Sequence, residues 1–183
     1  MKKKLPVIIA LIAIIAFSVW YGFTDKTHKL YDNNINTAQY NGLGVLPDGV
    51  TLEQSFKCEE DCIDAFLIKG SPVGDVQNTI VNVRVIDPET EEVISQGSVP
   101  GAGIVQRKLT KIAVDPVKGY KGKELVISVS EQNATPESGI SFFFQNEEGK
   151  ASQFFVGGEA REGVFIMKTV TERFDLETCI VMF

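Results

Sequence analysis

The stretch TIVNVRVIDPETEEVISQGSV, from Thr79 to Val99, contains the clearest sign of the fold. Its first part, Thr79–Asp87, places Ile80, Val83 and Val85 among polar neighbours, its last part, Glu92–Val99, suits pairing with the first, and a turn sequence lies between them. A period of two puts the apolar side chains on one face of a strand, because successive side chains point to opposite faces. The stretch therefore predicts an antiparallel β-hairpin with one buried face.

Similar short segments recur on both sides of this hairpin. They lie between turn residues at intervals of roughly 8 to 15 residues, a spacing typical of β-sandwiches. The segments are Val50–Phe56, Ile63–Gly70, Gln106–Asp115, Glu124–Glu131, Ile140–Asn146, Gly163–Phe174 and Glu177–Phe183. After the N-terminal segment, no run has the period of an amphipathic helix. We therefore predict that residues 50–183 form an all-β domain, an antiparallel β-sandwich.

The N-terminal segment has a different character. MKKK, residues 1–4, precedes Leu5–Phe23, a run of 19 residues without a charge. A helix of that length rises roughly 28 Å, close to the hydrocarbon thickness of a bilayer, and the lysines before it favour a cytoplasmic N-terminus. We expect a cytoplasmic stub followed by a single-pass signal-anchor in the cell membrane, with the C-terminal domain extracytoplasmic. A cleaved signal peptide is the alternative.

Residues 24–49 have the composition of a connecting segment. They are rich in Asn, Asp and Gly and follow no sustained period of 2 or 3.6. We expect a stalk between the anchor and the domain. Part of it is expected to pack on the domain, since Leu30, Tyr31, Ile35 and Tyr40 are apolar.

The balance of charge excludes one class of partner. The formal net charge of the whole chain is −6. All 24 acidic residues and 15 of the 18 basic ones follow Phe23, so the exported part carries −9. Nucleic acid is not expected as a partner, because a phosphate-binding face needs an excess of Lys and Arg. An acidic surface is also repelled by anionic lipid head groups.

Three cysteines, Cys58, Cys62 and Cys179, lie in the part expected to be exported. Thiols outside the cytoplasm tend to pair, so we predict a structural disulfide. A bond between Cys58 and Cys62 would close a small loop and gain little chain entropy, whereas a bond from either to Cys179 would gain more. The sequence leaves the connectivity open.

The segment between the first two cysteines is acidic. Its carboxylates and a nearby one are potential Ca²⁺ ligands, since calcium prefers oxygen donors. They are Glu59, Glu60, Asp61 and Asp64. No EF-hand spacing is present, so we favour a solvated acidic turn and predict neither a metal nor a cofactor. The one histidine, His28, lies far away in the expected stalk, which makes zinc sites and Ser-His-Asp catalysis improbable.

Clustered phenylalanines are the weak candidates for ligand binding. Aromatic rings can stack on the apolar faces of sugars. The residues concerned are Phe142, Phe143, Phe144, Phe154 and Phe155. The competing interpretation, which we favour, is that they fill the core of the sandwich.

Four stretches also follow the order of a known family. They are Thr51–Phe56, Asn78–Val99, Gly119–Glu147 and Phe154–Val170. Over residues 50–171 the chain resembles the jelly-roll module of bacterial surface proteins and of glycosyltransferase-associated membrane proteins. The resemblance implies a sandwich like that of carbohydrate-binding modules, in the bacterial cell envelope.

Taken together, these features favour a membrane-anchored extracytoplasmic binding or accessory module that recognises envelope glycans. The alternative is a structural subunit that docks onto a membrane protein complex. A small hydrolase with paired carboxylates is a third and weaker hypothesis, and catalysis is not expected. The expected partners are the membrane, through the N-terminal helix, and a glycan or a membrane protein.

Overall fold

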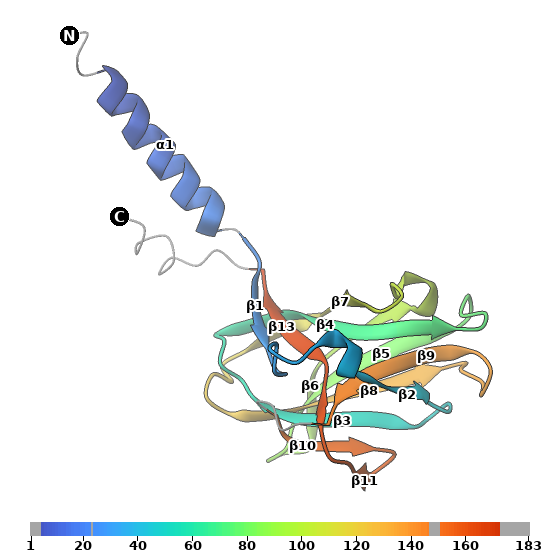
Figure 1. Cartoon of the computed structure of the whole chain (residues 1–183). Coiled ribbons are helices and arrows are strands. Elements are labelled where there is room, and N and C mark those ends of the chain that lie inside the picture. The colour runs from blue at the N-terminus through green and yellow to red at the C-terminus, as the bar shows by residue number, and fades with distance from the viewer. Residues whose placement is uncertain (1–4, 23, 147–150, 173–183) are drawn as a thin grey trace. The chain divides into compact units, whose positions relative to one another are not determined.

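The computed structural model describes residues 5–22, 24–146 and 151–172 of the chain. The chain divides into two compact units, Met1–Lys26 with Glu172–Phe183, and Thr27–Thr171. The first unit contains the helix α1, Leu5–Gly22, and the second contains the sheets (Figure 1). Within the described ranges no helix combines the length and the apolar character that crossing a bilayer requires.

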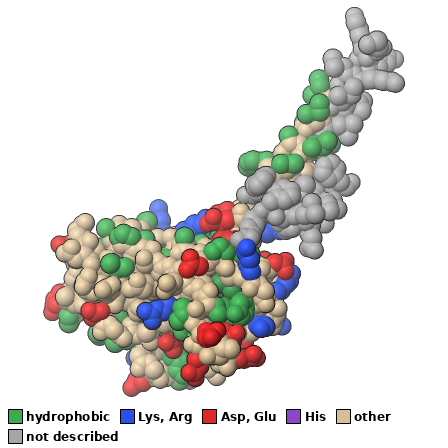
Figure 2. Space-filling model, turned by 180° about the vertical axis from the view of Figure 1, so that it is seen from behind, with side chains coloured by type: hydrophobic (Ala, Val, Ile, Leu, Met, Phe, Trp, Pro, Cys, Tyr) green, Lys and Arg blue, Asp and Glu red, His purple; other side chains and the backbone are tan. Residues whose placement is uncertain are grey.

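The described side chains of α1 are mostly apolar and exposed, as Figure 2 shows. The exposed fractions are 58% for Ile9, 61% for Ile12, 50% for Phe17 and 65% for Trp20. Ser18 is the exception, because its hydroxyl is buried and donates to Ile14 O, one turn earlier, at 2.9 Å. The polar group of Ser18 is thus satisfied inside the helix.

The second unit consists of two antiparallel sheets. Its strands are β1 (Lys26–Lys29), β2 (Asn41–Val45), β3 (Thr51–Lys57), β4 (Cys62–Val73), β5 (Ile80–Asp87), β6 (Glu92–Pro100), β7 (Lys108–Lys118), β8 (Glu124–Gln132), β9 (Gly139–Gln145), β10 (Ala151–Val156), β11 (Glu159–Ala160), β12 (Val164–Phe165) and β13 (Met167–Thr171). Short 3₁₀ helices lie at Thr37–Gln39 and Gly101–Gly103. An all-β, two-sheet antiparallel fold is therefore confirmed.

Sheet I is built around the long strand β4. Strand β7 lies along one edge of β4, and β13 and then β9 lie along the other. Strands β2 and β12 pair with β9, and β1 pairs with β13. Sheet II has the order β11-β10-β3-β8-β5-β6. The hairpin expected over Thr79–Val99 is present as β5 and β6.

The alternation in the hairpin corresponds to burial. Val81, Val83 and Val85 of β5 are fully buried, whereas Asn82 and Arg84 lie on the other face. On the inner face of β6, Gly97 lies where a Cβ atom would come within 1.9 Å of Ala113 O in β7. The edges of the two sheets therefore approach each other closely here, which only glycine permits.

The core lies between the sheets and contains most of the aromatic rings. Phe56 and Phe66 pack edge to face with their ring centroids 6.0 Å apart, and Phe142 and Phe165 do the same at 5.9 Å. All four of these side chains are fully buried. Such pairs add about 1 kcal/mol to the free energy gained from burying the rings.

One carboxylate is also buried in the interior. Glu131, on the inner face of β8, accepts hydrogen bonds from the N–H of Ile140 at 2.7 Å and of Leu46 at 3.3 Å. Burial raises the pKa of Glu131 to about 7, although these two hydrogen bonds act in the opposite direction. The side chain links sheet II to β9 and to the turn after β2.

The segment expected to be a stalk contributes instead to the sandwich. It includes β1 and β2, and Leu30 and Leu46 within it are buried. Residues 30–40, called the strap, lie over the outer face of sheet I. Tyr31 of the strap packs there with Phe143, Val164 and Ile166 in a second apolar cluster. The packing expected of part of this segment is present at Leu30, Tyr31 and Leu46, which are buried.

Candidate functional site

The outer face of sheet II presents two rows of mainly polar side chains. The first row runs Gln96–Arg84–Ser128–Glu53–Phe155 across β6, β5, β8, β3 and β10. The second runs Ser98–Asn82–Ser130–Thr51 across β6, β5, β8 and β3. These residues share one face because paired residues of neighbouring strands point the same way and the side-chain period is two. The two rows form a continuous hydrogen-bonding surface.

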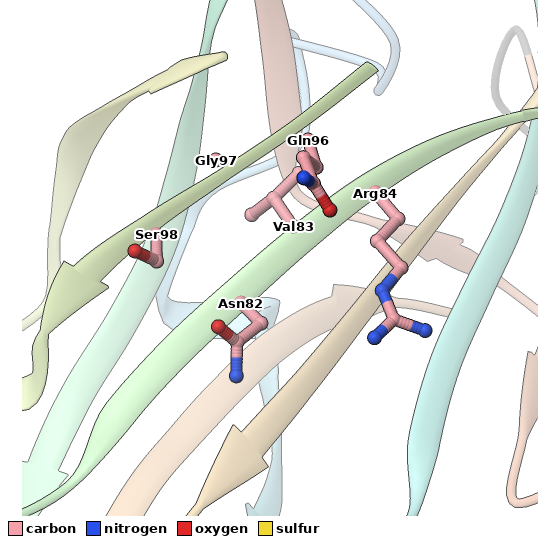
Figure 3. Close-up of a pocket in the computed structure, with 6 residues that line it drawn as sticks. All are labelled: Asn82, Val83, Arg84, Gln96, Gly97 and Ser98. Atoms are coloured by element: carbon pink, nitrogen blue, oxygen red, sulfur yellow. The ribbon is translucent and has the colours of Figure 1, made fainter. Parts of the chain in front are cut away.

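A pocket opens where the rows cross the hairpin (Figure 3). Its volume is about 210 Å³. Asn82 and Arg84 come from β5, and Gln96 and Ser98 come from β6, with the backbone at Val83 and Gly97 between them. The pocket offers two amides, a guanidinium and a hydroxyl on a framework of paired strands. Such groups can donate to and accept from a polyhydroxylated ligand.

The charged groups of this face differ in their surroundings. The Ser128 hydroxyl donates to Glu53 Oε1 at 3.3 Å, which orients that carboxylate. Arg84 is exposed, and no carboxylate of the described residues forms an ion pair with it. Its five N–H donors are therefore available to a ligand from solvent.

The phenylalanines named from the sequence occupy different places. Phe142 and Phe154 are in the core, Phe144 packs against the core, and Phe143 is buried beneath the strap. Phe155 is half-buried at the end of the first polar row. The structure thus brings one of the five aromatic candidates to the polar face.

The pocket residues were not identified in advance from the sequence. Asn82, Arg84, Gln96 and Ser98 are the outward positions of the hairpin whose inward positions predicted the fold. The signal for the pocket was the set of polar residues that alternate with the buried ones in the hairpin. It has no value for locating a site until the register of the strands is known, because every exposed strand face carries polar residues.

The cysteine turn joins β3 to β4 and contains no bond between its two cysteines. Cys58 and Cys62 are buried thiols; the first donates to Glu60 O at 3.3 Å and the second to Asp64 Oδ1 at 3.4 Å. Burial raises the pKa of the Cys58 thiol, which makes it a poor nucleophile. The structure shows no disulfide between Cys58 and Cys62, and Cys179 lies outside the described residues.

The carboxylates of this turn have partners within the protein. His28 Nε2 lies 3.2 Å from Glu59 Oε2, and Lys121 Nζ lies 3.1 Å from Asp61. The expectation that His28 is remote from the turn was wrong, because β1 brings it there. No group of three or more His, Cys, Asp or Glu side chains among the described residues is arranged to hold a metal ion.

No protein-family model matches the chain, and no curated protein matches it. The proposals below therefore depend on the geometry of the described residues and on the sequence.

Proposed function

We propose that this protein is an extracytoplasmic binding module that recognises a glycan of the cell envelope through the outer face of sheet II. The observation that carries the proposal is the pocket at Asn82, Arg84, Gln96 and Ser98. Ligand sites combine a concave surface with a few polar groups, and this pocket is lined by four polar side chains. Phe155, farther along the same face, adds an aromatic surface for stacking.

The order of the strands supports a finer description of the fold as a jelly roll. Sheet I contains the strand order β2-β9-β4-β7, and sheet II contains the strand order β3-β8-β5-β6. Two sheets connected in this way correspond to the paired Greek keys of a jelly roll. Many lectin domains have this architecture, which agrees with glycan binding but does not by itself imply it.

Membrane attachment through the N-terminal segment is part of the proposal. It draws on the uncharged sequence run Leu5–Phe23, of which Phe23 lies outside the described residues. The exposed apolar side chains of α1 and the internal hydrogen bond of Ser18 support it, because a bilayer leaves no water to satisfy a polar group. The same apolar surface favours a second proposal, that the protein is a subunit docked onto a membrane protein.

A glycan-array measurement tests the first proposal. The full-length protein in a non-ionic detergent is expected to bind a subset of envelope glycans. Arg84→Gln and Gln96→Ala should each weaken that binding by about fivefold or more, since each removes groups that hydrogen-bond the ligand. Lys118→Gln and Gln39→Ala are the controls, because they make comparable changes at exposed positions away from the pocket.

Two outcomes would contradict glycan binding at this face. One is equal binding by Arg84→Gln, Gln96→Ala and the two controls. The other is the absence of any glycan signal together with recovery of a stoichiometric membrane protein from detergent extracts. The second result would favour the docking subunit. The residues that line the pocket include no carboxylate, so the proposal is binding rather than glycoside hydrolysis.

A further inference from the structure

Four cationic side chains adjoin one another on the outer face of sheet I. Lys168 of β13 lies opposite Leu67 of β4, and Lys69 is two residues farther along β4 on the same face. Lys69 and Lys168 are thus diagonal neighbours, roughly 7–8 Å apart between backbones. Arg107 adjoins Lys69, because its N–H donates to Gly70 O, and Lys29 adjoins Lys168, because the N–H of the next residue, Leu30, donates to Met167 O.

The two lysines at the centre carry unfavourable electrostatic interactions. Burial lowers the pKa of Lys69, and the charge of Arg107 lowers it further. Burial lowers the pKa of Lys168 as well, and the charge of Lys29 adds to this effect. We call these four side chains, which are Arg107, Lys69, Lys168 and Lys29 in spatial order, the cationic row.

No carboxylate within residues 5–22, 24–146 and 151–172 forms an ion pair with any member of the cationic row. This is unusual for a chain with a net charge of −6, in which acidic residues outnumber basic ones. Like charges at neighbouring positions of a sheet destabilise the fold. An anion bound along the row would remove this repulsion.

The surroundings hold part of the row in position. Lys69 Nζ lies 5.0 Å from the ring centroid of Tyr40, in the strap, and 5.9 Å from that of Phe143. The backbone N–H of Arg107 donates to Gly70 O at 2.9 Å and to Ser71 Oγ at 3.0 Å. Arg107 also has a left-handed φ of 57°, so its backbone is constrained by these contacts. Cations with fixed positions favour a ligand with charges at fixed spacing.

We propose that the cationic row binds an acidic polysaccharide, a linear glycan with repeated carboxylate or phosphodiester groups. The row crosses neighbouring strands, which are about 4.8 Å apart, so an extended chain can meet successive cations. The half-exposed ring of Tyr40 beside Lys69 supplies a surface on which a sugar can stack. This site is on the opposite sheet from the pocket and does not depend on the function proposed above.

A membrane surface fits the row less well than a polysaccharide. Lys69 and Lys168 are half-buried among neighbouring side chains. A flat bilayer contacts side chains that protrude from a protein surface, whereas a flexible polysaccharide chain can also reach half-buried side chains.

Binding of defined polymers tests this proposal. The full-length protein in non-ionic detergent is titrated with polygalacturonate, poly(glycerol phosphate) and neutral dextran, and with mixed micelles of the same detergent that contain phosphatidylcholine or phosphatidylglycerol. At low salt we expect binding to one or both acidic polymers, weakening as salt is added, and none to dextran. Lys69→Gln and Lys168→Gln should each lower the affinity about three- to tenfold.

Lys123→Gln is the matched control. Lys123 Nζ also lies over an aromatic ring, 5.1 Å from the centroid of Tyr120, but it belongs to the turn before β8. Its substitution removes the same charge and the same kind of ring contact and should leave the affinity unchanged. Arg84→Gln should also leave it unchanged, which separates this site from the pocket of sheet II.

Three results would overturn the proposal: no binding to either acidic polymer at low salt, equal affinity for the Lys168→Gln and Lys123→Gln proteins, or a response to the phosphatidylglycerol micelles alone. Thermal unfolding distinguishes lost binding from lost folding. Removing the charge of Lys168 reduces repulsion within the row, so Lys168→Gln should be at least as stable as the wild-type protein at low salt.

Discussion

At the scale of single residues, Glu131 makes stability depend on pH in the direction opposite to that of most carboxylates. Burial raises its pKa from 4.5 to about 7, so the folded state binds more protons than the unfolded state between these values. The contribution of Glu131 is therefore most favourable below pH 4.5, declines as pH rises toward about 7 and then levels off. The shift corresponds to roughly 3 kcal/mol.

Urea unfolding from pH 4.5 to 8 measures this effect. Glu131→Gln keeps the shape of the side chain and one acceptor but does not titrate. The difference in unfolding free energy between the wild-type and Glu131→Gln proteins should therefore change across this range in favour of the variant. A difference that stays constant with pH would show that Glu131 does not titrate between the two values.

The phenylalanines provide a second prediction at this scale. Phe56 is fully buried and packs on Phe66, so Phe56→Ala should cost about 3–5 kcal/mol of unfolding free energy. Phe155 is half-buried on the outer face of sheet II, and Phe155→Ala should cost much less, about 1 kcal/mol. Chemical denaturation of both variants checks the contrast. Equal losses would mean that Phe155 is a core residue and is not available to a ligand.

At the scale of elements, Gln145 attaches the strap to the sandwich. The buried side chain of Gln145 donates to Asp32 O at 2.7 Å and accepts from Asp32 N–H at 3.2 Å. Gln145→Ala removes both bonds and leaves a cavity, so the strap should open more often. We expect amide hydrogen exchange in residues 30–40 to accelerate roughly tenfold to a hundredfold. Exchange that matches a Gln39→Ala control would contradict this role.

The placement of the strap could not be predicted from the sequence. Strands β5 and β8 were predictable because their local alternation agrees with their burial. The segment DNNINTAQYNG has no period, and its placement depends on residues more than 100 positions away, such as Gln145 for Asp32. Pairing between distant segments is set by the assembled sheet and leaves no local pattern.

The C-terminal part of the sandwich illustrates the same point. Gly163–Phe174 was expected to form one strand, but its described part is divided at Ile166 into β12 and β13. The N–H of Ile166 donates to Phe143 O of β9, and its carbonyl accepts from Lys69 N–H of β4. The segment changes partners where β4 and β9 diverge. The candidate site was hidden for a related reason, because its four side chains lie next to one another only once β5 and β6 are paired.

At the scale of the whole molecule, the sandwich presents two different outer faces on one core. The face of sheet II has amides, hydroxyls and one exposed guanidinium, whereas the face of sheet I has the strap and the cationic row. The rings between the sheets belong to a single apolar cluster. The second unit should therefore unfold as one cooperative body, with both faces lost together.

The two units should respond independently to denaturant, and the chain contains a probe for each. Trp20, the one tryptophan, is in α1, whereas Tyr31, Tyr40 and Tyr120 are in the second unit. If α1 lies in the membrane as proposed, a detergent micelle shields Trp20. Urea should then abolish the β-sheet circular dichroism and the tyrosine near-ultraviolet signal at one midpoint, without a red shift of tryptophan emission. A red shift at that same midpoint would mean that α1 depends on the sandwich for its environment, which would argue against a membrane anchor.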